Sequence, residues 1–315
     1  MVGEIGLGTW QLGTRWGEPF NEAEAMRILE SSYACGINLT DTADIYNDGN
    51  SERAIGAFLA RHSHHFFVVT KCGRGLMPHT AEGYTAEHME QFIDGSLKRL
   101  GVERLDMVLL HCPPSSVYRK DELFTGLDKL VRKGKMAHYG VSVEKVSEGL
   151  QAMEWPISAI EVVFNMFRMK PAERLFPEAA ARDIGILARV PLASGLLTGR
   201  YGPDTVFAKH DHRSYNRNGE AFDKGETFSG VDYALGLCAV EELKKLFRTE
   251  DLAPYALRWI LMHEAVSAVI PGASRQEQVL SNIRAASLPP LSREQMEGVA
   301  GIYDRHVRNV VHSRW

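Results

Sequence analysis

Four ionisable side chains lie at or just after the C-terminal ends of three successive apolar segments. They are Asp41, Tyr46, Lys71 and His111. The segments cover residues 37–40, 66–70 and 105–110. If the segments are strands of one parallel barrel, their carboxyl ends meet at a single face, where a polar side chain is more often part of the chemistry than of the packing. We therefore expect the four side chains to meet at one site.

Together these residue types could transfer a proton to a substrate oxygen. A tyrosine hydroxyl has an ordinary pKa of about 10 and donates poorly at neutral pH unless its phenolate is stabilised. A charged Lys71 beside Tyr46 would stabilise the phenolate, and Asp41 would keep that lysine charged and oriented. His111 can hydrogen-bond a carbonyl oxygen. Such a set suits the addition of hydride to a carbonyl group, whose oxygen gains negative charge.

Short apolar segments alternate with amphipathic helical segments along the whole chain. The expected strands cover residues 5–8, 37–40, 66–70, 105–110, 137–141, 159–163, 184–188 and 266–270. The expected helices cover residues 21–35, 51–61, 86–100, 121–133, 146–153, 174–182, 253–263 and 276–286. Eight β/α repeats predict an α/β protein with a parallel sheet closed into a (β/α)8 TIM barrel.

An open doubly wound sheet is the alternative fold. The turn after the first strand opposes it, because Gly6, Gly8 and Gly13 do not have the GxGxxG spacing that cradles a dinucleotide in that fold.

We predict one domain over residues 1–315, with two segments outside the repeat. The first, residues 192–245, contains a polar section rich in glycine and then an extra helix; the second is a C-terminal helix over residues 293–307. An insertion this long is usually a lid or a binding loop, and we expect it to clasp a cofactor.

Composition narrows the class of protein. The chain has 315 residues, a formal net charge of -4 and 44% hydrophobic residues, which is enough for a sizeable core. A net negative charge of this size does not attract nucleic acid or a membrane surface. No stretch of the sequence has the ~18 consecutive apolar residues that a membrane-spanning helix needs. The N-terminus has no signal-peptide pattern, so we expect a cytoplasmic protein. Scattered cysteines predict reduced thiols: Cys35, Cys72, Cys112 and Cys238.

Two histidine clusters consist of residue types that commonly bind metal ions, but neither cluster lies at a strand end. They are His62, His64 and His65, and His210, Asp211 and His212. Both lie in polar stretches, so we predict solvated surface and no metal site. Trp10, by contrast, follows the first strand and should form part of a cofactor or substrate wall.

Several motifs occur in the order and at the spacing of barrel strands. They are residues 6–10 (GLGTW), 38–46 (NLTDTADIY), 69–71 (VTK), 106–111 (DMVLLH), 140–142 (GVS), 191–199 (PLASGLLTG) and 271–275 (PGASR). In this arrangement the chain resembles the aldo-keto reductase family over almost its whole length. The resemblance implies Tyr46 as general acid, Lys71 and Asp41 as residues that tune it, and His111 as the residue that orients the carbonyl. It also implies NADPH or NADP+ as cofactor, with NADH less favoured.

The resemblance also implies a set of cofactor contacts. They are Thr9, Trp10, Asp41, Ser142, Glu161, Arg189, Leu192, Ser194, Leu196, Gly199, Arg200, Gly272, Ser274, Arg275, Gln278 and Asn282. The members between 192 and 200 match the loop that clasps the pyrophosphate. Ser274 and Arg275 match the contacts to the 2'-phosphate, and Gln278 and Asn282 match the adenosine end. An arginine here favours NADP over NAD, because its planar fork pairs well with a phosphate.

The chain departs from the family pattern at several points. Val143 replaces the usual asparagine and Glu161 the usual glutamine at the nicotinamide carboxamide. Arg189 replaces the aromatic ring that commonly stacks on the nicotinamide, as in a bacterial-type branch of the family. Only residues 1–4 precede the first strand, so we expect the barrel floor to be open or covered by the C-terminal tail.

These observations predict an enzyme that reversibly reduces an aldehyde or ketone with NADPH, with a small carbonyl compound as substrate and neither nucleic acid nor membrane as partner. One alternative is a non-catalytic, NADPH-binding redox sensor resembling potassium-channel β subunits. Another is a Schiff-base aldolase in which Lys71 attacks the carbonyl. That reaction needs a neutral lysine, which Asp41 would oppose.

Overall fold

The computed structural model describes residues 2–14, 18–62 and 66–315, which contain a sheet of eight parallel strands. The strands are β1 (Leu7–Gly8), β2 (Leu39–Asp41), β3 (Phe67–Cys72), β4 (Leu105–His111), β5 (Met136–Val143), β6 (Ala159–Val163), β7 (Gly185–Arg189) and β8 (Val266–Val269). They are neighbours in sequence order, and every pair is parallel.

The two edges of this sheet are joined. The Gly6 N–H donates to the Val269 oxygen at 2.9 Å, and the Gly8 N–H donates to the Pro271 oxygen at 3.0 Å. Parallel bridges therefore connect the segments around β1 and β8. This arrangement is consistent with the (β/α)8 fold, and the sequential strand order excludes the doubly wound alternative, in which the order reverses.

Helices follow the strands, as predicted. Those of the repeat are α1 (Glu22–Ala34), α2 (Asn50–Leu59), α3 (Ala86–Leu100), α4 (Asp121–Arg132), α5 (Val146–Ala152), α6 (Leu175–Ala181), α9 (Ala253–Leu261) and α10 (Gln276–Ser287). Asn21 caps α1 by accepting the Glu24 N–H, and Gly101 ends α3 in the left-handed conformation. Within the described ranges, no helix is both long and apolar enough to cross a bilayer.

A compact apolar layer fills the interior of the sheet. Its buried members are Leu39, Val69, Met107, Leu109, Ala159, Leu187, Ala268 and Ile270. Val2 and Phe67 pack against this layer. The backbones also approach closely here, because a Cβ on Gly140 would lie 2.2 Å from the Ala159 oxygen.

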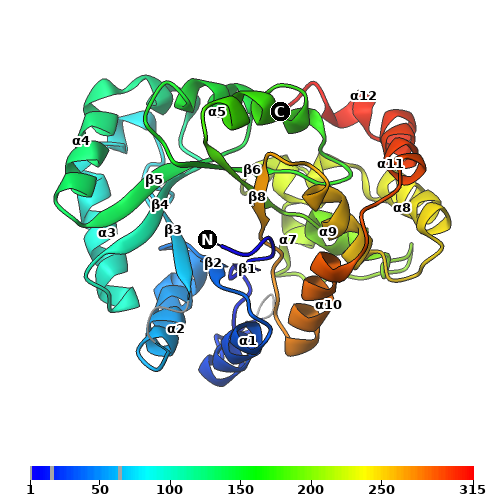
Figure 1. Ribbon diagram of the computed structural model, residues 1–315, viewed down its shortest axis with the longest axis horizontal. Helices are drawn as coiled ribbons and strands as arrows, with labels where there is room; N and C mark the ends of the chain where they lie inside the picture. The colour runs from blue at the N-terminus through cyan, green and yellow to red at the C-terminus, as the bar shows by residue number, and fades with distance from the viewer. Residues whose placement is uncertain (1, 15–17, 63–65) are drawn as a thin grey trace.

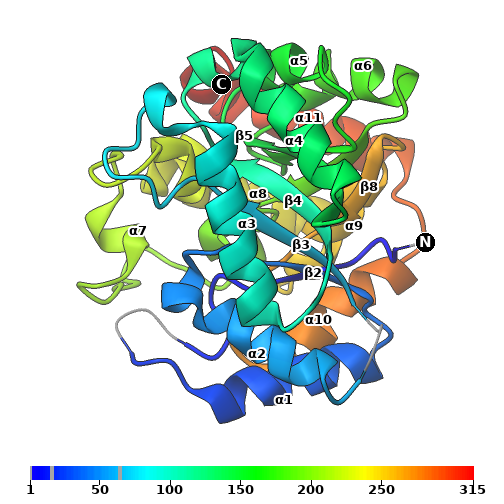
Figure 2. The same cartoon turned by 90° about the vertical axis from the view of Figure 1, so that its left-hand side faces the viewer.

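The C-terminal tail does not cover the floor of the sheet, contrary to one of the two expectations, and Val2 supplies part of the cover instead. The tail lies at the other end, where the Trp315 indole N–H donates to Asp223 of the insertion at 2.8 Å. Figure 2 shows the N-terminus and the insertion helix α7 (His212–Tyr215) on opposite sides of the molecule.

The insertion after β7 ends in the predicted extra helix. This helix, α8 (Tyr233–Phe247), lies beside the C-terminal helix α11 (Arg293–His306), as Figure 1 shows; a short helix, α12 (Arg308–Val311), follows. Glu242 of α8 accepts a hydrogen bond from the His306 ring at 2.6 Å. The two segments outside the repeat thus pack on each other.

Candidate active site

The structure brings the four residues predicted from strand ends together. Asp41, Lys71 and His111 lie on β2, β3 and β4, and Tyr46 begins a short 3-10 helix after β2. The Lys71 Nζ donates to both Asp41 carboxylate oxygens, at 2.6 and 2.7 Å, and to the Thr42 carbonyl at 3.0 Å. It lies 3.5 Å from the Tyr46 hydroxyl. A fully buried ammonium therefore stands between a carboxylate and the phenol.

Electrostatics keep this lysine charged. Burial by itself would lower the pKa of Lys71, but Asp41 and then Glu161 raise it above its ordinary value. Burial raises the pKa of Tyr46, and Lys71 opposes that rise. Burial, followed by the charge of Glu161, also raises the pKa of Asp41, while Lys71 works in the opposite direction. Lys71 is thus the group that favours a phenolate at Tyr46.

His111 faces the tyrosine as a neutral ring. Its centroid lies 5.9 Å from that of Tyr46 in an edge-on arrangement. Burial, and then the positive charge of Lys71, lowers the pKa of His111 well below its ordinary value. Its Nδ1 makes no hydrogen bond to any described residue. A neutral imidazole can donate one hydrogen bond to a carbonyl oxygen without competing for the proton that is transferred.

A cavity of about 520 Å³ opens beside the Tyr46 ring. Its walls come from the segments after β1 and β7, from the insertion and from the segment between β8 and α10. Most of the predicted cofactor contacts line it: Thr9, Trp10, Asp41, Glu161, Arg189, Leu192, Ser194, Gly272, Ser274, Arg275 and Gln278. The residues expected to bind opposite ends of a dinucleotide therefore line one cavity.

Five predicted contacts lie outside the wall of this cavity. Leu196 is fully buried in the core, and Gly199 ends a 3-10 helix with a φ of 78°. The exposed Arg200 lies 3.7 Å from Asp251. Asn282 donates to the Gly272 carbonyl at 3.4 Å.

Ser142 is the fifth, and its hydroxyl is already engaged by a neighbour on the next strand. Ser142 is 1% exposed and donates to Glu161 at 3.1 Å. The Thr9 hydroxyl is similarly engaged, because it donates to the Asp41 carbonyl at 2.8 Å. Their side chains therefore position other residues of the site.

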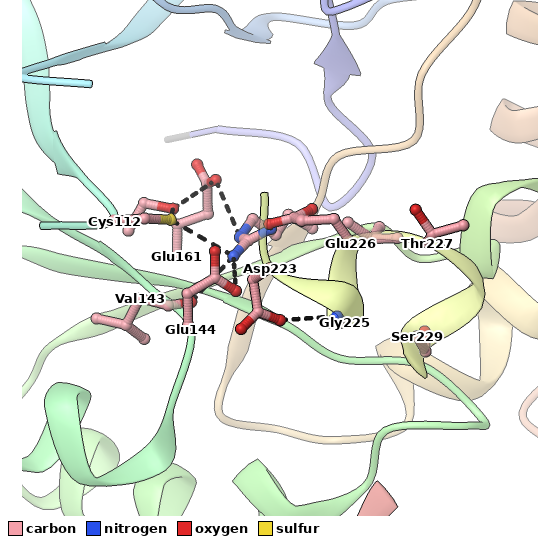
Figure 3. Close-up of polar contacts among 12 residues, drawn as sticks. Cys112, Val143, Glu144, Glu161, Asp223, Gly225, Glu226, Thr227 and Ser229 are labelled. Carbon is pink, nitrogen blue, oxygen red and sulfur yellow. Dashed lines mark hydrogen bonds and ion pairs between the residues drawn. The ribbon is translucent and has the colours of Figure 1, made fainter. Parts of the chain in front are cut away.

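Three carboxylates surround Arg189 (Figure 3). Its guanidinium bonds to Glu226 of the insertion, lies 3.3 Å from Glu144 and 3.7 Å from Glu161, and donates to the Val143 carbonyl at 3.1 Å. Burial would lower the pKa of Arg189, but Glu226 and its acidic neighbours raise it well above its ordinary value. The arginine that replaces the usual stacking ring is thus held by opposite charge.

Two of these carboxylates, Glu144 and Glu226, were not predicted from the sequence. Burial and then Glu226 raise the pKa of Glu144 to about 7, whereas Arg189 lowers that of Glu226 against the effect of burial. Glu144 follows the end of β5 directly, so the strand-end argument could have found it. Glu226 lies in an irregular polar stretch with no such signal. Together with Cys112 they could form a metal-type triad, but the Arg189 guanidinium already contacts all three.

One of the two histidine clusters is not the solvated surface that its polar sequence suggested. His212 is 4% exposed and Asp211 is 3% exposed, and both line the cavity. The His212 ring lies 5.2 Å from that of Trp10, which in turn stacks 6.4 Å from Tyr46. Burial lowers the pKa of His212 to about 4, so the ring is neutral. The insertion folds over and buries this pair, which local polarity could not reveal.

Of the remaining histidines, His210 is exposed, as predicted. His62 is half-buried instead, because its ring stacks 4.5 Å from that of Phe58 and lies 3.1 Å from Glu30. His64 and His65 lie outside the described residues.

All four cysteines are free thiols, as predicted. Cys72 and Cys112, beside Lys71 and His111 in sequence, are buried. Burial raises the pKa of both thiols, which keeps them protonated and unreactive.

Comparison with known proteins agrees with this geometry. The chain is 28% identical over 305 residues to YqkF, an uncharacterized oxidoreductase of Bacillus subtilis (strain 168), covering 95% of this chain and 92% of that one. Among solved structures, the glycerol dehydrogenase AKR11B4 from Gluconobacter oxydans is 29% identical, with a TM-score of 0.78 over 97% of this chain and 93% of that one. The holo form of the aldo-keto reductase AKR11C1 from Bacillus halodurans is 25% identical, with a TM-score of 0.75 over 96% and 92%.

These similarities confirm the resemblance that the motifs indicated. The model of the Aldo/keto reductase family matches residues 4–304, nearly the whole chain. The protein therefore belongs to the aldo/keto reductase family of NAD(P)H-dependent oxidoreductases.

Proposed function

We propose that the protein reduces an aldehyde or ketone to the alcohol with NADPH, in a reversible reaction. The observation that carries this proposal is the Lys71 ammonium, which contacts both Asp41 oxygens and lies 3.5 Å from the Tyr46 hydroxyl at the wall of a cavity. A lysine held in this way favours loss of the tyrosine proton, which is what a reduced carbonyl oxygen must receive.

The cavity residues between β8 and α10 fit the phosphate end of NADPH. Arg275 is exposed on the wall, makes no ion pair with any described residue, and lies at the N-cap of α10. The N-terminus of a helix presents free N–H groups and a partial positive charge to an anion. At Gly272, a Cβ would meet only the Gly8 oxygen at 3.9 Å, so the backbone here is open to a ligand. A bound reduced nicotinamide would supply the hydride.

The side chains near Tyr46 have complementary tasks in this reaction. Tyr46 donates its proton to the carbonyl oxygen as negative charge develops there, and Lys71 stabilises the phenolate that remains. His111 orients the carbonyl through a hydrogen bond to the same oxygen. Trp10 and His212 form an aromatic wall beside the tyrosine and exclude water from the reacting atoms.

The Schiff-base alternative is opposed by the same contacts. An amine attacks a carbonyl only when it is neutral. Lys71 is fully buried, contacts Asp41 and lies 3.4 Å from Glu161, and both carboxylates raise its pKa. The ammonium form is therefore strongly favoured.

A panel of aldehydes and ketones, each incubated with NADPH and the protein, tests the proposal. We expect NADPH oxidation with formation of the alcohol, and slower oxidation with NADH. If NADPH binds tightly but no carbonyl compound is reduced, the proposal fails and the non-catalytic redox sensor is favoured. Borohydride trapping of a substrate on Lys71 would instead identify an aldolase.

A further inference from the structure

Glu161 is a second carboxylate on the Lys71 ammonium. It lies on β6, across the interior from β3, and is 1% exposed. One of its oxygens lies 3.4 Å from the Lys71 Nζ. The other accepts the Ser142 hydroxyl at 3.1 Å and lies 3.7 Å from the Arg189 Nε. Glu161 therefore connects Lys71 with the Arg189 cluster, which consists of Arg189, Glu144 and Glu226.

The strand register fixes this placement. His111 pairs with Ser142 across β4 and β5, and Ser142 pairs with Glu161 across β5 and β6. The three residues thus share one level of the sheet, at the end where Lys71 and Tyr46 meet. The glutamine that the family resemblance implies as usual at this position would carry no charge. Glu161 adds a buried negative charge to the site.

We propose that Glu161 is a positioning residue of the hydride-transfer reaction: by holding Lys71 together with Asp41, it sets how readily Tyr46 releases its proton. The inference rests on the proposed function. It differs from the carboxamide-binding role that the family resemblance implies for this position, because it depends on charge and on contact with Lys71 rather than on contact with a cofactor.

The sign of the effect follows from the charges that face Tyr46 and Lys71. Asp41 on β2, Glu161 on β6 and Glu226 of the insertion are negative and disfavour the phenolate. Lys71 on β3 favours it. Neutral His111 on β4 adds no charge, and Arg189 on β7 is held by its own carboxylates. When the charge of Glu161 is removed, less negative charge balances the positive charge of Lys71. Tyr46 should therefore lose its proton at lower pH.

Replacement of Glu161 by Gln tests this directly, because it removes the charge and keeps the shape. The Tyr46 phenolate can be followed without turnover, as the ultraviolet difference between a protein and its Tyr46→Phe counterpart during alkaline titration. We expect this signal to appear roughly one pH unit lower in Glu161→Gln than in the parent, the shift typical of one charge removed from a partly buried site. An unchanged titration would overturn the proposal.

Glu144→Gln is the matched control. It removes a carboxylate from the same Arg189 cluster, 3.3 Å from the guanidinium, without touching Lys71. We expect its Tyr46 titration to follow the parent, and an equal shift in both variants would assign the effect to Arg189 and overturn the proposal. Glu161→Asp keeps the negative charge and provides a second variant if Glu161→Gln fails to fold. We expect it to shift the Tyr46 titration less than Glu161→Gln does.

Kinetics then separate this inference from the proposed function. In Glu161→Gln, the alkaline decline in the rate of carbonyl reduction should move to lower pH with the phenolate signal, while damage to structure would lower the rate at every pH equally. A shifted phenolate in a protein that reduces no carbonyl would contradict the proposed function and leave the tuning of Tyr46 by Glu161 intact. If Glu161 only held the nicotinamide carboxamide, neither the phenolate titration nor the alkaline decline in rate would shift in Glu161→Gln.

Discussion

The proposed chemistry depends on one hydroxyl, that of Tyr46, and on the ammonium beside it. Phenylalanine keeps the ring, which stacks on Trp10 and meets His111 edge-on, and removes only the proton donor. We expect Tyr46→Phe to lower the turnover number by at least ~100-fold, the usual contribution of a general acid, with little change in NADPH affinity. Steady-state kinetics and cofactor titration check both parts.

Tyr33→Phe, which removes a hydroxyl from the 41% exposed Tyr33 on α1, should keep full turnover. Near-normal turnover of Tyr46→Phe would assign the proton transfer to another group.

The guanidinium of Arg275 should decide between the two nicotinamide cofactors. Because it is exposed, unpaired among the described residues and placed at the start of α10, it is free to bind the 2'-phosphate that only NADPH carries. Arg275→Ala should weaken NADPH binding by about 1.5 to 3 kcal/mol, the size of a charged hydrogen bond, and leave NADH binding almost unchanged.

The comparison variant is Arg284→Ala, on the same helix but 3.6 Å from Asp251. It should affect neither cofactor. Equal losses of both cofactors in Arg275→Ala would show that this arginine does not distinguish them.

Among the elements, the insertion departs most from what its sequence suggested. It folds onto the strand ends through Glu226 and buries His212 beside Trp10. Burial lowers the pKa of His212 to about 4, below the ordinary value of about 6.5 in an unfolded chain. The unfolded chain therefore binds this proton more readily. The stability that depends on a neutral His212 is complete above pH ~6.5 and is lost as the pH falls toward 4.

We expect the free energy of unfolding in urea to fall by on the order of 3 kcal/mol from this residue between those two pH values. His212→Gln should remove that part of the pH dependence, because glutamine does not titrate. His138→Gln changes an exposed ring and should leave the curve as it is. If the parent and His212→Gln lose stability in parallel, His212 is not the group that titrates.

The strands and helices were predictable because each depends on a local pattern. The segment 159–163, in which apolar residues flank Glu161 on both sides, is recognisable from its neighbours alone, and β6 has the same bounds in the structure. The meeting of the four residues of the candidate active site was predictable for a related reason, since a parallel barrel brings all strand ends to one face. The positions of Glu226 and His212 could not be predicted in this way. Their partners, Arg189 and Trp10, lie far away in sequence, and no periodic pattern marks the insertion.

In the molecule as a whole, close contact between strands holds the sheet in its curved form. A Cβ at position 140 would lie 2.2 Å from the Ala159 oxygen, a backbone atom that cannot rotate away. Gly140→Ala should therefore force β5 and β6 apart and lower the free energy of unfolding by at least about 2 kcal/mol. A lower urea midpoint with an unchanged slope would show this.

Gly202→Ala provides the control, because a Cβ there has no atom within 4 Å. Its urea midpoint should stay within the error of the parent. A Gly140→Ala protein as stable as Gly202→Ala would mean that the sheet can open at β5 without loss.

The bridge between Gly8 and Gly272 also bears on how the protein is made. A ribosome releases the N-terminal strands first, so Asp41, Tyr46, Lys71 and His111 emerge long before β8 exists. Until that last strand arrives, β1 has one exposed edge, and such edges pair readily with other chains. Pairing between residues so distant in sequence is also slow. A nascent chain stalled before residue 266 should therefore carry all four side chains of the candidate active site and depend on chaperones to remain unaggregated.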